Sequence, residues 1–387
     1  MYRYMCMNQI SEVGISNFTE EYVKTDNLQE AHALLVRSAD LHQTELPENL
    51  LAIARAGAGV NNIPLEECSQ KGIVVFNTPG ANANGVKELV FAGMLLAARD
   101  IIGGANWVAS REGDPEVTKK TEKEKKRFAG SELLGKKLGI IGLGAIGVQV
   151  ANAAYHFGMD VYGFDPYISV EAAWNLSRNI HHISDVEEIY RKCDYITIHV
   201  PLTDSTRHMI DQRALEMMKQ GVVIVNYSRD LLVDEEAVLS SIKAGKVHRY
   251  VTDFPNAVTA GKPGVIATPH LGASTAESED NCAAMAVNEL KNFLEHGNIR
   301  NSVNYPNCDL GKCTAPGRIA IYHKNVKKMI GRFAEILSDT NIRNMSNTSK
   351  GAYAYTLIDL DEKADPDILS KLESIEEVIK VRNIVNQ

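Results

Sequence analysis

Short apolar runs of strand length alternate with longer, more polar segments of helical character between residues 30 and 100. The runs are residues 33–36, 51–54 and 73–76. Alternation of this kind is typical of βα units, whose strands pair in a parallel sheet. A helix follows from about residue 85 to 99, and its dense apolar residues predict that it is buried.

A second series of βα units begins near residue 136. Strands are predicted at residues 137–141, 161–164, 195–198, 222–225, 250–252 and 265–267. In doubly wound sheets, ligands bind beyond the carboxyl ends of the strands, so the residues that follow these runs are the first candidates for a site. A long helix at residues 277–298 is expected to return the chain to the first domain.

The last seventy residues have a different order of elements. Residues 306–316 are expected to be a linker, and residues 317–387 show the order βαββαβ, the split ferredoxin-like pattern. The predicted fold is therefore α/β, with two doubly wound parallel-sheet domains and a small C-terminal α+β domain.

Composition narrows the class of protein. The chain has 387 residues, of which 44% are hydrophobic and 23% charged, which predicts a globular protein of roughly two to three domains. Its net charge of -8 argues against a nucleic-acid partner. No apolar run approaches the ~18 residues of a membrane span, and the first ten residues lack a signal-peptide pattern. Six scattered cysteines without a C-x-x-C pair indicate reduced thiols, no metal site and a cytoplasmic protein.

The most informative motif is GLGAIG at residues 142–147, between a predicted strand and a predicted helix. Gly142 allows a tight turn, Gly144 lets a pyrophosphate approach, and Gly147 lets the helix pack on the sheet. Asp165 ends the next strand, where it can bind a ribose diol and repel a 2′-phosphate, which predicts NAD rather than NADP. The alternative is a glycine-rich turn that binds no ligand.

Two side chains beyond strand ends suit hydride chemistry. Removal of a hydride from a carbinol carbon requires a base for the hydroxyl proton, and His270 follows the last predicted strand. Arg229 follows residues 222–225, where its guanidinium can hold a carboxylate with two hydrogen bonds. The alternative for Arg229 is a surface ion pair with Asp230 or Asp234. The lysine-rich residues 112–131 are either a solvated loop or a cationic rim beside an anionic substrate.

Several of these segments together resemble the D-2-hydroxyacid dehydrogenase family, and within it the phosphoglycerate dehydrogenases. The matching segments are residues 55–62 (RAGAGVNN), 77–79 (NTP), 142–147 (GLGAIG), 199–202 (HVPL), 225–229 (VNYSR) and 269–275 (PHLGAST). The resemblance implies a flavodoxin-like substrate domain, a Rossmann NAD domain and a C-terminal ACT regulatory domain. The expected boundaries are residues 1–99 with 277–305 for the substrate domain, 100–276 for the NAD domain, 306–316 for the linker and 317–387 for the ACT domain.

The resemblance also implies roles. Arg229 would bind the substrate carboxylate and His270 would be the acid/base. Substrate binding would use Arg55 for the phosphate and the amides of Gly57 and Ala58 for the carboxylate, with Lys126 and Arg127 as weaker phosphate candidates. The implied cofactor residues are Thr78, Gly142, Gly144, Ala145, Ile146, Gly147, Asp165, His199, Val200, Pro201, Tyr227, Ser228, Asp253, Gly272 and Ala273.

Two departures from the family pattern affect the catalytic residues. The family places a glutamate shortly after the position of Asp253, where it pairs with the histidine, but residues 253–258 read DFPNAV. Either His270 works without a carboxylate, which predicts a pH–rate profile shifted toward acid, or another acid such as Asp253 reaches it. Asp230 replaces the family's usual glycine after the arginine.

The ACT resemblance implies a possible L-serine effector site at His323, Asn325 and Asn341, and the alternative is an assembly domain without a ligand. The function implied is NAD-dependent oxidation of 3-phospho-D-glycerate to 3-phosphohydroxypyruvate, the first step of L-serine biosynthesis, by a homo-oligomer (a dimer or a tetramer). The alternatives are another D-2-hydroxyacid dehydrogenase, acting on glycerate or lactate, and a non-catalytic NAD-sensing corepressor.

Overall fold

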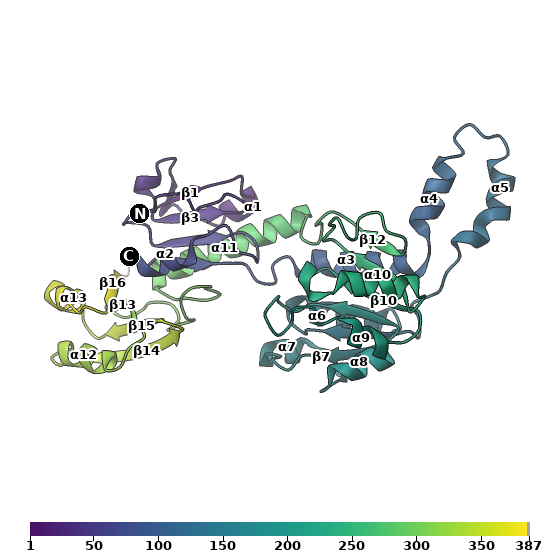
Figure 1. The fold of residues 1–387 in the computed structure, drawn as a ribbon. Helices are drawn as coiled ribbons and strands as arrows, with labels where there is room; N and C mark the ends of the chain where they lie inside the picture. Colours follow the sequence, from purple (N-terminus) through teal and green to yellow (C-terminus); the bar gives the residue numbers. More distant parts are fainter. Residues whose placement is uncertain (385–387) are drawn as a thin grey trace. The chain divides into compact units, whose positions relative to one another are not determined.

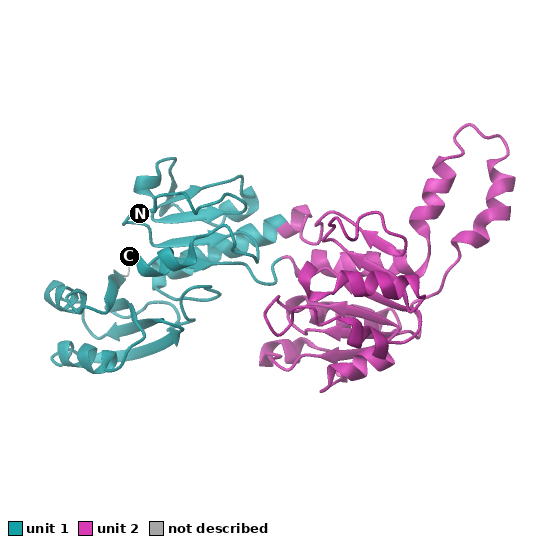
Figure 2. Cartoon of the chain, viewed as in Figure 1, with its two compact units in different colours: residues 1–81, 279–387 teal, residues 82–278 magenta. Residues whose placement is uncertain are grey.

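A computed structural model describes residues 1–384 as two compact units (Figures 1 and 2). Unit 1 contains Met1–Ala81 and the chain from Glu279 onward, and unit 2 contains Asn82–Ser278. None of the helices within residues 1–384 has the length and apolarity that a membrane span requires.

The first sheet of unit 1 is parallel and has the strand order β2-β1-β3-β4-β5. Its strands are β1 (Tyr2–Cys6), β2 (Tyr22–Lys24), β3 (Ala33–Val36), β4 (Ala52–Arg55) and β5 (Val74–Phe76). The accompanying helices are α1 (Glu12–Ile15), the 3₁₀ turn η1 (Leu28–Glu30), α2 (Leu65–Gln70) and the long α11 (Ala276–His296). This order is the flavodoxin-like one, so the expected doubly wound fold of this region is confirmed.

Unit 2 contains a seven-stranded parallel sheet of order β12-β11-β10-β9-β6-β7-β8. The strands are β6 (Lys137–Ile141), β7 (Asp160–Phe164), β8 (His181–His182), β9 (Tyr195–Ile198), β10 (Val222–Asn226), β11 (Val247–Thr252) and β12 (Val265–Ala267). The helices are α3 (Ala83–Ala98), α4 (Ile101–Ala109), α5 (Val117–Glu124), η2 (Lys125–Phe128), α6 (Ala145–His156), α7 (Val170–Asn175), α8 (Val186–Lys192), α9 (Gln212–Met217), η3 (Asp230–Leu232) and α10 (Glu235–Lys243). The order reverses between β6 and β9, which is the switch point of a Rossmann sheet and the place where such folds bind ligands.

Helix α3 changes the expected boundary between the units. The sequence predicts that residues 1–99 belong to the first domain, but α3 belongs to unit 2 in the structure. Its Val90 and Met94 are fully buried in a core with Leu138 and Val225 of the unit 2 sheet. An apolar helix packs against whichever sheet buries its apolar face. The sequence pattern predicts that the helix is buried but does not show which of the two sheets buries it.

Residues 117–128 are helical rather than a loop, which corrects the loop expectation for this part of the lysine-rich segment. Helices α4 and α5 form a hairpin that extends away from the sheet of unit 2 (Figure 1), and none of their residues is buried. Lys120, Lys125 and Arg127 each pair with an acid of the same segment, respectively Asp114, Glu122 and Glu124. These local pairs favour a solvated face over a cationic rim.

The C-terminal module has the predicted βαββαβ order. Its elements are β13 (Gly317–Lys324), α12 (Met329–Ile336), β14 (Ile342–Lys350), β15 (Tyr353–Leu360), α13 (Pro366–Glu373) and β16 (Val378–Ile384). The antiparallel sheet has the order β14-β15-β13-β16. This arrangement confirms the ferredoxin-like fold of the module.

Strand β13 is buried on both of its faces. Ile321 packs in a cluster with Phe333 of α12, whereas Tyr322 on the opposite face shares a core with Leu294 of α11. The hydroxyl of Tyr355 donates to the carbonyl of Gly297 at 2.7 Å, just after α11. The module is therefore packed into unit 1 through a common hydrophobic core.

The expected linker, residues 306–316, is also packed. Cys308 and Cys313 are free thiols, are almost completely buried and belong to the core of unit 1. The backbone of Cys308 pairs with Ile299 by two hydrogen bonds of 2.8 and 3.0 Å. This segment is a fixed connection rather than a free tether.

Candidate active site

The glycine motif forms the turn between β6 and α6, as the sequence predicts. Gly142 has a φ of 97°, and a Cβ on it would lie 2.5 Å from the carbonyl oxygen of His199. A Cβ on Gly147 would lie 1.9 Å from the carbonyl oxygen of Gly142, so this position needs glycine for close packing. At Gly144 a Cβ would meet no described atom within 4 Å. The backbone above Gly144 is therefore open to a ligand at the N-terminus of α6.

Asp165 is tied directly to this turn. One carboxylate oxygen accepts a hydrogen bond from the amide of Leu143 at 2.8 Å, and the other accepts from the amide of Tyr167 at 2.8 Å. Both bonds come from the backbone, so they fix the carboxylate and leave its remaining lone pairs for a ribose diol.

The other predicted cofactor residues of unit 2 follow the carboxyl ends of its strands or begin α6. They are Ala145 and Ile146 in α6, His199, Val200 and Pro201 after β9, Tyr227 and Ser228 after β10, Asp253 after β11, and Gly272 and Ala273 after β12. Because these strands are parallel neighbours, their ends meet at one edge of the sheet.

Arg229 follows β10 with a fixed backbone and an exposed side chain. Its carbonyl accepts from Asn226 Nδ2 at 2.8 Å, and its Nη1 donates to the carbonyl of Ser228 at 2.6 Å. No ion pair joins it to Asp230 or Asp234 in the part of the chain that the structure describes, since Asp234 caps α10 instead. The guanidinium remains available for an anion.

His270 is exposed, and its ring makes no hydrogen bond to residues 1–384. The ring packs against Phe254, with 4.7 Å between the centroids. Asp253, immediately before Phe254, is fully buried and accepts from the amide of Gly272 at 3.1 Å. Burial raises the pKa of Asp253, and the charge of His270 acts in the opposite direction. Asp253 is therefore an acid that interacts electrostatically with the candidate base.

Three of the predicted cofactor residues carry a buried polar atom without a partner. Among residues 1–384, these atoms are Thr78 Oγ1, His199 Nδ1 and Asp253 Oδ1. Burial lowers the pKa of His199 to about 4, which keeps its ring neutral, and its other nitrogen lies 3.0 Å from Thr197 Oγ1. An orphaned buried polar group is costly, and a bound cofactor is one means of satisfying it. Thr268 Oγ1, two residues before His270, is a further orphan that the sequence analysis missed.

The substrate-side candidates of unit 1 lie together at the ends of β4 and β5. A Cβ on Gly57, whose φ is 146°, would fall 2.0 Å from Nη1 of Arg55, so the guanidinium lies over this glycine. The carbonyl of Gly57 accepts from the amide of Thr78 at 3.1 Å, and that of Ala58 accepts from Asn77 Nδ2 at 2.7 Å. Arg55 Nε donates to the carbonyl of Arg37 at 3.2 Å, which fixes its direction.

Comparison with known proteins identifies the family. Residues 91–272 match the NAD binding domain of D-isomer specific 2-hydroxyacid dehydrogenases. The chain is 39% identical over 295 residues to the hydroxypyruvate reductase of Thermotoga maritima, which covers 72% of this chain and 90% of that protein. It is also 34% identical over 370 residues to the D-3-phosphoglycerate dehydrogenase of Methanocaldococcus jannaschii, or 92% of this chain and 67% of that protein. The chain belongs to the D-isomer specific 2-hydroxyacid dehydrogenase family.

The structure of a relative supports the prediction that this dehydrogenase binds NAD. The NAD⁺-bound 3-phosphoglycerate dehydrogenase of Entamoeba histolytica has a TM-score of 0.60 and 27% identity, over 78% of this chain and 98% of that one. Together with the open Gly144 turn and the orphaned polar atoms, it identifies NAD as the cofactor. The chain spans about two thirds of the length of the archaeal phosphoglycerate dehydrogenases and about half that of the human one.

The segment after Asp253, in which the family's glutamate is missing, forms a hydrogen-bonded turn. Asn256 donates from Nδ2 to Glu235 Oε2 at 2.6 Å, and its Oδ1 accepts from the amides of Val258 and Thr259 at 2.9 and 3.1 Å. These bonds stabilise the turn after β11 rather than contact His270. Sequence reasoning missed Glu235, whose Oε1 is buried without a described partner and whose pKa is raised because of burial.

The C-terminal candidates of this dehydrogenase do not converge within one chain. His323 is 2% exposed, and its ring nitrogens contact the carbonyl of Lys324 and Thr356 Oγ1, both at 2.9 Å. Asn325 follows β13, whereas Asn341 precedes β14 at the opposite end of the sheet, because Lys324 and Ile342 pair with opposite ends of β15. Asn347, 3.3 Å from the His323 ring, is a neighbour that the sequence did not indicate.

Proposed function

We propose that this chain catalyses the NAD-dependent oxidation of 3-phospho-D-glycerate to 3-phosphohydroxypyruvate, the first step of L-serine biosynthesis. The observation that carries the proposal is that Arg229 and His270 are both exposed beyond the carboxyl ends of strands β10 and β12, in the sheet that holds the nucleotide turn. Relatives named D-3-phosphoglycerate dehydrogenase, matched over most of this chain, support the choice of substrate.

The chemistry assigns one task to each group. When bound, NAD supplies the acceptor for the hydride from C2 of the substrate. Arg229 would hold the C1 carboxylate through two hydrogen bonds, and His270 would remove the hydroxyl proton from C2 as the carbonyl forms. Asp253 would favour the protonated imidazole that results. In unit 1, Arg55 is the candidate for the phosphate and the amides of Gly57 and Ala58 are candidates for the carboxylate.

The second candidate function is a different dehydrogenase of the same family, acting on glycerate, hydroxypyruvate or lactate. The 39% identity to the hydroxypyruvate reductase, over 90% of that protein, favours it. A non-catalytic NAD-sensing corepressor is a third candidate, against which the exposed His270 and Arg229 argue.

The test is the rate of NADH formation with 3-phosphoglycerate, compared with glycerate and D-lactate at equal concentration. We expect kcat/KM for the phosphorylated acid to be the highest by at least ten-fold. A preference for glycerate would overturn the proposed substrate but not the proposal that the chain is a 2-hydroxyacid dehydrogenase. NAD binding without turnover of any of these acids would favour the corepressor.

We further propose that the enzyme is a cytoplasmic homo-oligomer regulated by L-serine at the C-terminal module. Asn325 is exposed and donates to the carbonyl of Gly351 at 3.1 Å, and Asn341 is exposed as well. The buried His323 would act by positioning this loop. The test is inhibition by L-serine up to millimolar concentration, with Asn325→Ala as the variant expected to weaken it. Absence of inhibition in the unmodified enzyme would leave assembly as the role of the module.

A further inference from the structure

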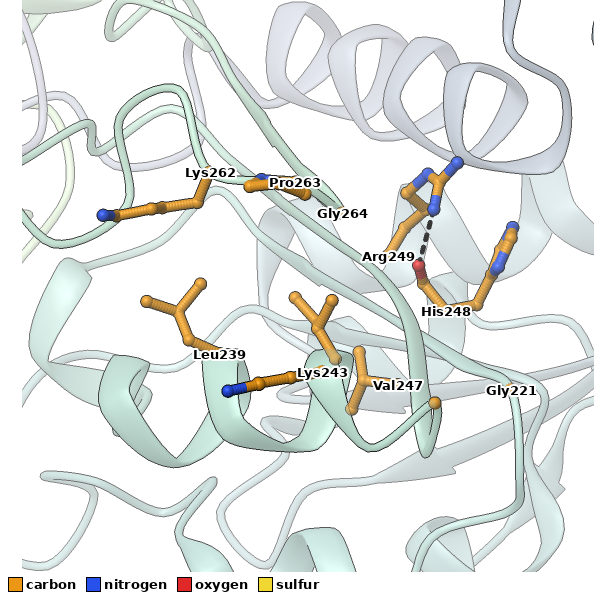
Figure 3. Close-up of a pocket in the computed structure, with 11 residues that line it drawn as sticks. Gly221, Leu239, Lys243, Val247, His248, Arg249, Lys262, Pro263 and Gly264 are labelled. Carbon is orange, nitrogen blue, oxygen red and sulfur yellow. Dashed lines mark hydrogen bonds between the residues drawn. The ribbon is translucent and has the colours of Figure 1, made fainter.

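A basic pocket lies in unit 2 at the edge of the sheet opposite Arg229 and His270. Its volume is about 640 Å³, and we call it the amino-edge pocket because the amino ends of β11 and β12 border it. Its lining includes Lys243, His248, Arg249 and Lys262 (Figure 3).

The charged groups of the pocket lack opposite charges. No aspartate or glutamate lines it, and no ion pair within residues 1–384 involves these four side chains. Arg249 Nη1 donates to the carbonyl of His248 at 2.9 Å, which fixes one end of the guanidinium (Figure 3). Three permanent cations and one imidazole around a single cavity create a positive potential that attracts anions.

The middle of the pocket is apolar. Leu239 lies between Lys243 and Lys262, which extend toward the same side, whereas the Arg249 and His248 side chains extend away from the two lysines (Figure 3). Val247 also lines the pocket. Gly264 completes this wall, because a Cβ there would fall 2.5 Å from Ile242 Cγ2. The pocket thus combines two cationic ends with an apolar centre, which suits an elongated molecule with an anionic group at each end.

Three strands separate this pocket from the candidate active site. Strands β10, β11 and β12 begin near it, and their opposite ends precede Arg229, Asp253 and His270. Strands of three to six residues span roughly 10–20 Å, so one small molecule does not occupy both places.

We propose that the amino-edge pocket binds a small organic dianion, a molecule with two carboxylates or a carboxylate and a phosphate joined by a short apolar segment. Lys243 and Lys262 would hold one anionic group, and Arg249 with His248 would hold the other. The apolar side chains of Leu239 and Val247 would contact the connecting carbons.

The test is calorimetric titration of the whole protein with glutarate, a dicarboxylate without the 2-hydroxyl or 2-oxo group that the candidate reaction requires. We expect saturable binding that weakens at least ten-fold in the double variant Lys243→Gln/Lys262→Gln. The matched control is Lys24→Gln/Lys363→Gln, which removes the same charge at exposed lysines of unit 1 and should bind within two-fold of the unmodified protein.

A second control uses Arg229→Ala, which removes the candidate carboxylate ligand at the opposite edge and should leave glutarate binding intact. Loss of binding in Arg229→Ala, with binding retained in Lys243→Gln/Lys262→Gln, would assign glutarate to the active site and overturn the proposal. Absence of saturable binding, or a change of oligomer size in the lysine variant measured by sedimentation, would overturn it as well. A change of oligomer size would indicate that the pocket lies in an interface between copies of the chain.

Discussion

His270 and His323 show how differently one residue type is used in the two units. His270 is exposed beyond β12 of unit 2, with a ring that packs on Phe254 and makes no hydrogen bond to the described chain. His323 is 2% exposed in the C-terminal module, where both of its nitrogens have partners. The first ring has no hydrogen-bonding partner in the described chain, and the second contacts groups on β13, β14 and β15.

The difference teaches that the position of a residue in the sheet decides its use. The carboxyl edge of a parallel sheet collects loop residues that need not satisfy the core. His323 lies near the carboxyl end of β13, a strand that is covered on both faces, so a polar group there must find partners inside the protein. Both histidines match family motifs, but their positions in the sheets support a functional role for His270 more strongly than for His323.

The largest expected effect comes from His270. Replacement by Gln should lower kcat by about 10³-fold, because the hydroxyl proton loses its acceptor. The readout is NADH formation, and NAD affinity measured by fluorescence should stay within two-fold. The contrasting variant His323→Gln should retain at least half of the activity. An equal loss of kcat in both variants would contradict the distinction between the two histidines.

Substitution of Arg229 should have the second-largest effect on activity. Arg229→Lys retains the charge but removes the bidentate fork, and we expect kcat/KM for the hydroxyacid to fall by about 10²-fold, equivalent to about 3 kcal/mol. The measurement is steady-state kinetics at several substrate concentrations. An unchanged kcat/KM would mean that another cation binds the carboxylate.

Asp253 should have a smaller effect that depends on pH. Removal of its negative charge in Asp253→Asn lowers the basicity of His270, so the acidic limb of the kcat/KM profile should move toward lower pH by about one unit. The matched variant Glu235→Gln alters a buried acid of the same unit that contacts Asn256 and should leave that limb in place. If the limb moves in Glu235→Gln instead, Asp253 is not the partner of the imidazole.

The smallest effect concerns the stability of the C-terminal module. Burial lowers the pKa of His323, so its protonation opposes folding, and stability should be lost as pH falls below about 6.5. His323→Gln should cost about 1–3 kcal/mol at pH 8, because Thr356 and Asn347 lose a partner, and should flatten this dependence. Thermal unfolding at pH 5.5 and pH 8 measures both. A steeper pH dependence in the variant would be inconsistent with a buried neutral ring.

The fold was largely predictable from local pattern. Apolar runs between helical segments predicted the parallel sheets, and residues 142–147 with Asp165 predicted the cofactor, because the βα turn and the strand end are defined within about thirty residues. The position of Arg229, Asp253 and His270 beyond the ends of β10, β11 and β12 was also predictable, since each follows an apolar run of strand length.

Other features could not be predicted because they depend on contacts between distant segments. The assignment of α3 to unit 2 depends on which sheet covers it, and the bond between Asn256 and Glu235 joins residues 21 apart in sequence. The amino-edge pocket depends on three strand ends and helix α10 coming together without an acidic side chain.

The sequence by itself determined the succession of elements, the nucleotide turn and the strand ends that carry Arg229 and His270, because these follow from local periodicity and chain order. The tertiary structure alone decided which polar groups are free and which are used in packing. Burial of His323 between α12 and the neighbouring strands is the clearest case, since a side chain's exposure is set by residues far away in the chain.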